Sequence, residues 1–375
     1  MDKNKLNILE INFSRAWGGL EMQMPIIAGG LKELGHNVIV ACPGMSPAEK
    51  AASQLGLRVI NLENKIKYFD LPVILKLKNI IRDNKIDVVH SHMAKDLPVI
   101  IPAGKMAGCK KIYFTRHIES HYRKKSVFHF ILYRSLTGAI AITNAVKESL
   151  IETTHIIPEK IDVIYCGINV EKFRQRALQG NILRKEYNVP EDFYMIGVVG
   201  RLQDGKGHEY MLRAMPEVIK KIPKIKIFIV GEETKGEENG YKNYLESVVK
   251  ELNIPDSVIF TGFRPDLPVV MNSLDILVMP SKREAFGLVA VEAMALNKVV
   301  IATKSLGTQE IIDDGKDGFL APYGKSEILS EKIINILNDP VKAEKMGEMA
   351  QKKVEEKFEF NKNIKKLEQL FLSTP

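Results

Sequence analysis

The sequence predicts an α/β protein with two doubly wound parallel sheets, one in each half of the chain. Short β-rich runs alternate with amphipathic stretches along the whole length, which is the pattern of βαβ units. The length of 375 residues exceeds what one hydrophobic core usually serves. The composition, with 45% hydrophobic and 27% charged residues, is that of a folded protein and excludes a disordered or low-complexity chain.

The first half holds a series of candidate strands separated by helical patterns. These strands are expected at residues 7–13, 37–42, 58–62, 88–91, 111–115, 138–143 and 161–165. Gly35 follows the segment Leu31–Leu34 and is typical of a helix C-cap. We therefore assign a structural role to His36, which begins the next strand.

The second half contains a further alternating series. Its strands are expected at residues 194–199, 226–230, 258–261, 276–279 and 299–302. Residues 170–192 between the two series are charged and weakly periodic, which favours a linker with a short helix, and residues 339–372 form a Lys/Glu-rich helical run. We predict domains at residues 1–175 and 176–357, with a C-terminal helix at 358–375 that packs back on the first domain. Two such sheets predict a ligand-binding cleft at the carboxyl ends of their strands.

Cysteine spacing and hydropathy indicate a cytoplasmic protein. Cys42, Cys109 and Cys166 lie far apart without a CxxC motif, so neither a disulfide framework nor a thiolate metal site is expected. No stretch approaches the roughly 18 consecutive apolar residues that cross a bilayer. The first apolar run is too short for the core of a secretory signal.

The positive charge is confined to the first half. Residues 1–175 contain 25 Lys and Arg against 16 Asp and Glu, a balance of +9, whereas the remainder has 29 against 30, a balance of −1. Such a surface favours anionic partners, although it can also serve solubility alone. Residues 116–134 interleave cations with aromatic side chains, which favours contact with an anionic membrane at the inner face of the plasma membrane. No nucleic-acid module surrounds this run, so we expect no nucleic-acid partner.

The segment 280–294 gives the strongest local signal for a ligand site. A strand end is followed by a glycine at a helix start and by an apolar helix body. Free backbone N–H groups at such a helix start can hold a diphosphate. They belong to Phe286, Gly287, Leu288 and Val289. Glu292 lies about 7 Å further along the helix axis, where a ribose would lie, and Glu284 precedes the helix and can accept hydrogen bonds from sugar hydroxyls.

Arg201 and Lys206 are candidate cations for a departing diphosphate. They flank a glycine turn directly after the first strand of the second half. The sequence lacks the DxD motif that usually holds a metal ion beside a nucleotide-sugar, so fixed cations would stabilise the leaving group. It also lacks GxGxxG after a strand and GxxxxGK[ST], which argues against a dehydrogenase and a P-loop ATPase.

Histidine pairs do not predict a metal site. His90 and His92 alternate at a strand end, and His117 and His121 are four residues apart. No third ligand follows either pair at a metal-binding spacing, so we expect no metal. The glycines Gly18 and Gly19 follow the first strand, and they permit either a close approach to a phosphate or acceptor or a simple tight turn.

At these residues the chain resembles the GT-B glycosyltransferases of family 4, a retaining group. The family's E-x7-E element corresponds to Glu284 and Glu292, and its G-R-L…K-G element to residues 200–207. The resemblance runs from residue 8 to about residue 358. It implies two Rossmann-like domains that face a central cleft, with a nucleotide-sugar bound to the second. It also implies metal-independent transfer without a cofactor.

The resemblance and the motifs together assign the site. His117 is expected to contact the transferred sugar. The catalytic residues are expected to be His117, Arg201, Lys206 and Glu284. Donor binding is assigned to these cations and Glu284, and to Gly19, Gly231, Arg264, Phe286, Gly287, Leu288, Val289 and Glu292. Acceptor-side candidates are Gly18, Glu21, His92 and Asn144.

The expected function is a retaining transfer of a sugar to a hydroxyl of a glycan or glycolipid, of the hexosyltransferase type. The donor is expected to be a UDP- or GDP-sugar, and the resemblance points to lipopolysaccharide or other cell-surface glycans. A nucleotide-sugar epimerase or a phosphorylase on the same scaffold is an alternative, since a fold does not fix a function. A phosphorylase would need pyridoxal phosphate and a longer chain. A non-catalytic glycan-binding protein gives no reason for Arg201, Lys206, Glu284 and Glu292 to occur together.

Overall fold

The computed structural model describes residues 5–64, 66, 68–120, 122–178, 182–234 and 239–373. The chain forms two compact units, Met1–Tyr165 with Asn361–Pro375, and Cys166–Phe360. The sequence placed the first boundary ten residues later because residues 166–175 carry no strand signal. In the structure α7 (Val170–Ala177) packs on α11 (Leu267–Ser273), and Arg174 Nε donates to the carbonyl of Ala295 at 2.9 Å. These contacts place α7 in the second unit.

The first unit is a parallel sheet of seven strands in the order β3-β2-β1-β4-β5-β6-β7. Every predicted strand of this half is present, several of them shorter than expected. The strands are β1 (Asn7–Ile11), β2 (Asn37–Cys42), β3 (Arg58–Asn61), β4 (Val88–Ser91), β5 (Lys111–Arg116), β6 (Gly138–Ala141) and β7 (Ile161–Val163). The helices between them are α1 (Gly19–Glu33), α2 (Pro47–Gln54), α3 (Leu71–Asp83), α4 (Leu97–Met106), α5 (Val127–Arg134) and α6 (Asn144–Thr153).

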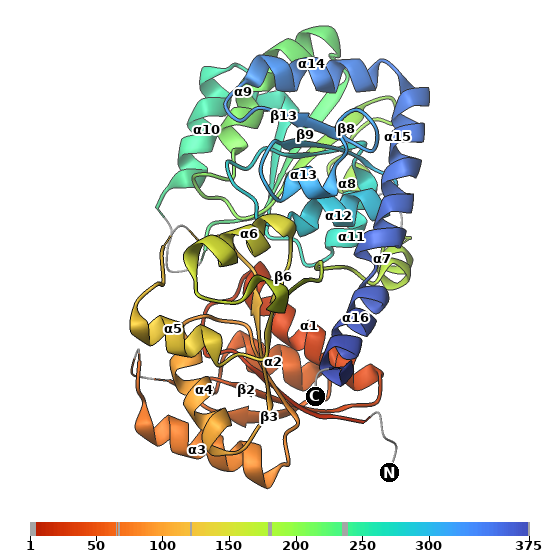
Figure 1. Cartoon of the computed structure of the whole chain (residues 1–375). Coiled ribbons are helices and arrows are strands. Elements are labelled where there is room, and N and C mark those ends of the chain that lie inside the picture. Colours follow the sequence, from red (N-terminus) through yellow and green to blue (C-terminus); the bar gives the residue numbers. More distant parts are fainter. Residues whose placement is uncertain are drawn as a thin grey trace. The chain divides into compact units, whose positions relative to one another are not determined.

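The C-terminal helix α16 (Phe360–Ser373) belongs almost entirely to the first unit, and Figure 1 draws it in dark blue beside the red and orange elements. His36 is buried and its Nε2 lies 3.0 Å from Glu368 Oε1. Lys111 Nζ donates to the carbonyl of Phe371 at 2.7 Å, and Tyr113 donates to that of Leu370. The amphipathic helical pattern at the end of the sequence thus covers the first sheet.

The second unit is a parallel sheet of six strands in the order β10-β9-β8-β11-β12-β13. Its strands are β8 (Tyr194–Val199), β9 (Ile225–Val230), β10 (Val258–Gly262), β11 (Ile276–Met279), β12 (Val299–Thr303) and β13 (Phe319–Ala321). The sequence analysis missed β13, which has only three residues and therefore no measurable alternation.

The helices of the second unit surround its sheet (Figure 1). Besides α7 and α11 they are α8 (Ile182–Glu186), α9 (His208–Lys221), α10 (Tyr241–Glu251), α12 (Leu288–Ala295), α13 (Thr308–Ile311), α14 (Ser326–Leu337) and α15 (Pro340–Lys353). The predicted linker at 170–192 thus contains two helices, α7 and α8. The helical run at the end of the chain is broken by a π-helical turn at Val354–Phe358.

Each sheet has one point where the direction of winding reverses. In the first sheet it lies between β1 and β4, and in the second between β8 and β11. At such a point the loops that follow the two strands diverge and leave space at the carboxyl edge of the sheet, which is where open α/β sheets bind ligands. Among the described residues, no helix is both long and apolar enough to cross a membrane.

Candidate functional site

Lys206 and Glu284 form an ion pair at the β8/β11 edge of the second sheet. Lys206 Nζ lies 3.1 Å from Glu284 Oε2, and both side chains are partly exposed. The pair joins the loop after β8 to the loop after β11. Because a partly exposed ion pair contributes only about 1 kcal/mol or less, an anionic ligand can take the place of Glu284 beside this ammonium.

Arg201 adds a second cation to this edge. It is the second residue after β8, and its side chain is exposed. In the described part of the chain, no hydrogen bond or ion pair uses its guanidinium. A planar guanidinium with free donors is suited to bidentate binding of phosphate oxygens.

Gly207 sets the spacing between the two loops. Its φ is +77°, and a Cβ atom there would lie 2.0 Å from the carbonyl oxygen of Pro280 in the loop after β11. Gly205 also has a positive φ, +85°, but a Cβ atom there would meet nothing within 4 Å. Gly207 is therefore required for the close approach of the loops, whereas Gly205 is required only for its own turn.

The start of α12 lies directly after these loops. Gly287 is its N-cap, with φ +102°, and the helix begins at Leu288. First-turn N–H groups have no acceptor within their helix, so this end favours an anion. Two groups after β12 hold the carbonyl of Glu284, the Gly307 N–H at 3.2 Å and the Ser305 hydroxyl at 3.3 Å.

Glu292 lies within α12, beyond its first turn, and is largely buried. Burial raises the pKa of Glu292 to about 8, with weak opposition from the charge of Arg176. Without a ligand this carboxyl is therefore mostly protonated at neutral pH. Hydroxyl groups that donate to it would favour the ionised form.

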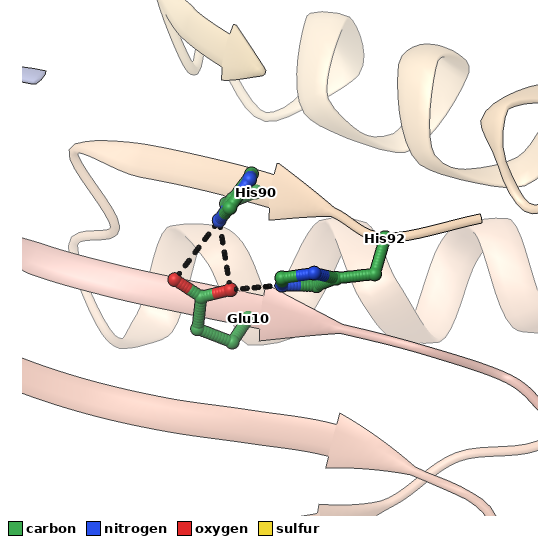
Figure 2. Close-up of side chains that lie close together, drawn as sticks. All are labelled: Glu10, His90 and His92. Atoms are coloured by element: carbon green, nitrogen blue, oxygen red, sulfur yellow. Dashed lines mark hydrogen bonds and ion pairs between the residues drawn. The ribbon is translucent and has the colours of Figure 1, made fainter. Parts of the chain in front are cut away.

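A buried cluster occupies the corresponding β1/β4 edge of the first sheet. Glu10 on β1 accepts from His90 on β4 and from His92 just beyond it, as Figure 2 shows. Glu10 Oε2 lies 2.9 Å from His90 Nδ1 and 2.6 Å from His92 Nε2. Burial acts to raise the pKa of Glu10, but His90 and His92, which hydrogen-bond to its carboxylate, outweigh burial and lower that pKa to about 2.

These three residues have the chemistry of a metal donor set but the spacing of a hydrogen-bonded group. Their ligand atoms all lie within 4.8 Å of one another, and the sequence analysis had found no third ligand for the histidine pair. Two ligands about 2.0 Å from a tetrahedral Zn²⁺ ion lie about 3.3 Å apart. The separations of 2.6 and 2.9 Å are shorter and match charge-assisted hydrogen bonds.

Comparison with known proteins agrees with this architecture. The family model described as Glycosyltransferase Family 4 matches residues 17–172, and that described as Glycosyl transferases group 1 matches residues 180–353. The chain is 25% identical, over 81% of its length and 79% of the relative, to an Escherichia coli UDP-Gal:alpha-D-GlcNAc-diphosphoundecaprenol alpha-1,3-galactosyltransferase. It is 26% identical, with the same coverage, to the N-acetyl-alpha-D-glucosaminyl L-malate synthase of Bacillus anthracis.

Solved structures agree over the whole length. A glycosyltransferase of Rickettsia africae superposes with a TM-score of 0.88 at 25% identity, covering 99% of this chain and 100% of the other. Anabaena HepE, solved with UDP and glucose, superposes with a TM-score of 0.84 at 24% identity, covering 98% and 100%. The chain belongs to the GT-B glycosyltransferases. The expected fold class is thereby confirmed.

Among the predicted donor residues of this glycosyltransferase, Arg264 has its guanidinium paired with two carboxylates. It contacts both oxygens of Glu186, at 2.8 and 2.7 Å, and both oxygens of Asp266, at 2.9 and 2.8 Å. Gly231 lies at the end of β9 in a crowded position, where a Cβ atom would be 1.9 Å from the carbonyl oxygen of Gly200. The prediction that these two residues bind donor stays open.

The acceptor-side candidates of the transferase lie in the first unit. Gly18 is the N-cap of α1, and Gly19 is its first residue. Glu21 accepts from the Ser14 hydroxyl at 3.1 Å, and Asn144 Nδ2 lies 3.2 Å from the Tyr165 hydroxyl. His92 is buried within the cluster described above, so its side chain contacts protein groups.

Glu10 and the anchoring of Glu284 by Ser305 and Gly307 are not among the sequence-based predictions. Glu10 carries a usable signal, because a carboxylate inside the apolar strand Ile8-Leu-Glu-Ile11 must be buried and therefore paired. No comparable signal exists for Ser305 and Gly307. Their role depends on the loop after β12 folding against the loop after β11, which residue types alone do not reveal.

Proposed function

We propose that this glycosyltransferase transfers a sugar from a nucleoside diphosphate donor, with retention and without a metal ion, to a hydroxyl of a glycan or lipid-linked acceptor. The observation that carries the proposal is the convergence of Lys206 and Arg201 with the start of α12 at one edge of the second sheet. These are three sources of positive potential, and a diphosphate is the ligand that needs them.

The donor occupies this edge with its diphosphate at the cations and its ribose at Glu292. When the donor binds, Lys206 pairs with the phosphate in place of Glu284, and Glu284 accepts hydrogen bonds from hydroxyls of the sugar. A UDP-sugar is favoured because Anabaena HepE was solved with UDP and with UDP-glucose, and the Escherichia coli relative is named for UDP-Gal. That relative's name also includes a diphosphoundecaprenol-linked sugar, which favours a lipid-linked acceptor.

Transfer proceeds at the face from which the diphosphate leaves. The bond between the anomeric carbon and the phosphate oxygen breaks, and the acceptor hydroxyl forms the new bond on the same side. The hydroxyl proton passes to an oxygen of the departing diphosphate. Arg201, Lys206 and the N–H groups at the start of α12 stabilise the charge that this oxygen develops.

A thermal-shift panel tests the donor assignment. UDP-, GDP- and ADP-sugars are each added to the full-length protein, and the ligand that binds the folded state raises Tm, by about 2.7 kcal/mol of stabilisation at 100 times its Kd. UDP-sugars are expected to give the largest shift. Absence of a shift with every nucleotide would remove the proposal.

Metal independence is tested separately. Because two side-chain cations supply the positive charge, EDTA is expected to leave the turnover rate nearly unchanged. If most activity disappears with EDTA and returns with Mn²⁺ or Mg²⁺, the metal-free mechanism is wrong even though donor binding stands.

We further propose that the first unit binds an anionic membrane surface. Tyr122 is 84% exposed and Val127 78%, and both belong to the predicted basic–aromatic run. Phe69, from the loop before α3, packs edge-on against Phe128 of α5 with ring centroids 5.5 Å apart, and is itself more than half exposed. The apolar surface therefore spans two segments of the chain.

Four cations flank this apolar surface, and all but the half-buried Lys124 are exposed. Arg123, Lys124 and Lys125 precede α5, and Arg134 at its end lies 5.3 Å above the Phe130 ring. The run is shorter than predicted, because Arg116 is buried and donates to the carbonyl of Ile118. Residue 121 lies outside the described residues. Apolar side chains ringed by cations are typical of surfaces that bind anionic lipid.

A further inference from the structure

The cluster at the β1/β4 edge continues in both directions from Glu10 as one buried chain of hydrogen bonds. His90 Nε2 lies 2.7 Å from the Thr115 hydroxyl, and His90 Nδ1 contacts the carboxylate of Glu10. On the other side, His92 Nε2 contacts Glu10, and His92 Nδ1 lies 3.1 Å from His117 Nε2. All five side chains are buried.

The carboxylate fixes the position of every proton on this side of the chain. An ionised carboxylate only accepts, so the His92 Nε2 facing Glu10 must carry a hydrogen. Burial lowers the pKa of His92, and burial followed by the charges of its neighbours lowers that of His117 well below the usual value. The lowered pKa values of both rings favour their neutral forms, with one N–H each.

A neutral His92 with hydrogen on Nε2 has a lone pair on Nδ1. That lone pair faces His117 Nε2, so His117 Nε2 must donate. His117 then has its own lone pair on Nδ1. Within the described structure, His117 Nδ1 is buried without a hydrogen-bond partner. An orphaned buried acceptor costs free energy unless a donor reaches it.

We propose that Glu10 and His92 are positioning residues that hold His117 in the Nε2–H tautomer, so that its Nδ1 is kept as an acceptor for a sugar hydroxyl. His117 follows β5 directly, and the next residue, Ile118, is 51% exposed, so the buried chain ends beside an exposed residue of the first unit. The hydrogen bond to a sugar rests on the proposed function, whereas the assignment of the His117 tautomer is independent of it.

Nitrogen chemical shifts test the tautomer directly. In full-length protein labelled with ¹⁵N-histidine, long-range ¹H–¹⁵N correlations distinguish the protonated from the bare ring nitrogen of each of the eight histidines. We expect hydrogen on Nε2 of His92 and His117 and on Nδ1 of His90. Hydrogen on Nδ1 of His117 overturns the proposal, whether or not sugar transfer has been detected.

Glu10→Gln tests whether the tautomer is transmitted. A glutamine side chain has an accepting carbonyl and a donating amino group. If the carbonyl faces His92, the hydrogen stays on His92 Nε2; if the amino group faces it, the hydrogen moves to His92 Nδ1. In either orientation His92 and His117 must carry hydrogen on the same ring position. The proposal is wrong if the hydrogen moves to the other ring nitrogen in only one of His92 and His117, because the two tautomers are then not coupled.

Activity should follow the tautomer of His117. If both rings reverse in Glu10→Gln, His117 Nδ1–H can only donate, so the sugar hydroxyl must turn from donor to acceptor, and kcat is expected to fall about 10-fold. If neither reverses, kcat should stay within about twofold. Thr115→Val is the matched control, since it disturbs the far side of Glu10. It should lower Tm without changing the His117 tautomer. If that tautomer changes, the hydrogen-bonded residues have only a structural role.

Discussion

The two sheets share the same strand order, but different kinds of side chain lie at the point where the order reverses. At the β8/β11 edge, Lys206 is partly exposed with a replaceable partner, and Arg201 is exposed. At the β1/β4 edge, Glu10, His90 and His92 are buried and use one another as partners. The second edge thus leaves its cations open to a ligand, whereas the first engages its polar side chains with one another. The sheet topology determines where a site can form, and the side chains at that edge determine what it can bind.

The largest difference between the edges should appear on removal of the cations. Arg201→Ala and Lys206→Ala are each expected to lower kcat about 10²- to 10³-fold, the range for removing one group that stabilises developing negative charge. The measurement is the initial rate at saturating donor. Lys224→Ala is the control, because this exposed lysine pairs with Asp192 away from the site and should change little. Equal losses in all three variants would contradict the assignment.

Substitution of Glu292 and of Glu284 should have different effects on the affinity for a nucleoside diphosphate that carries no sugar. Glu292→Gln is expected to weaken binding of free UDP about 10- to 100-fold, since a charged hydrogen bond contributes about 1.5–3 kcal/mol. Glu284→Gln should spare it, because Glu284 is assigned to the sugar. Calorimetry with UDP and each variant decides. Similar losses in both variants would mean that Glu284 also contacts the nucleotide.

Gly207→Ala tests whether the loops at the second edge depend on their close approach. Gly205→Ala introduces only a left-handed alanine, at a cost of about 1–2 kcal/mol. Gly207→Ala adds a clash with the Pro280 carbonyl and should cost about 1–3 kcal/mol more. Denaturant unfolding of both variants measures the difference. Equal free energies of unfolding would show that the loops move apart freely.

Glu292 should make the second unit less stable as the pH rises. Its folded pKa of about 8 lies above the usual glutamate pKa of 4.5, so the folded state holds its proton more tightly than the unfolded state. The stability contributed by this proton is present below about pH 4.5 and is lost as the pH rises to 8. Glu292→Gln should therefore raise Tm relative to the wild type by a margin that grows from pH 5 to pH 8. A constant margin would mean that Glu292 is ionised throughout.

The smallest effect concerns the outer surface of the first unit. Each Lys or Arg near an anionic membrane contributes about 1 kcal/mol. Changing Arg123, Lys124 and Lys125 to Ser should therefore weaken binding to phosphatidylserine vesicles, and added salt should weaken it further. Changing the exposed Lys220, Lys221 and Lys250 of the second unit to Ser is the control. Equal binding to anionic and neutral vesicles at low salt would contradict the membrane proposal.

Much of the second edge could be predicted because its signals are local in sequence. The strand ending at Met279, the N-cap Gly287 and the acidic pair Glu284 and Glu292 lie within one short segment. The chain of hydrogen bonds at the first edge could not be predicted, since Glu10 and His90 are eighty residues apart and meet only through the pairing of β1 with β4. Their partnership depends on the strand register, which the sequence pattern does not give.

The position of α16 determines when the first unit can be completed. Its Phe371 ring lies 5.0 Å from Tyr113 and 5.4 Å from His90, so this helix covers the buried chain of hydrogen bonds. The whole of Cys166–Phe360 precedes it during synthesis. At about 5–20 residues per second, the ribosome needs about 10 to 40 s to make that stretch. The first sheet therefore emerges early but stays uncovered until the second unit has been made, so the unit that begins first is finished last.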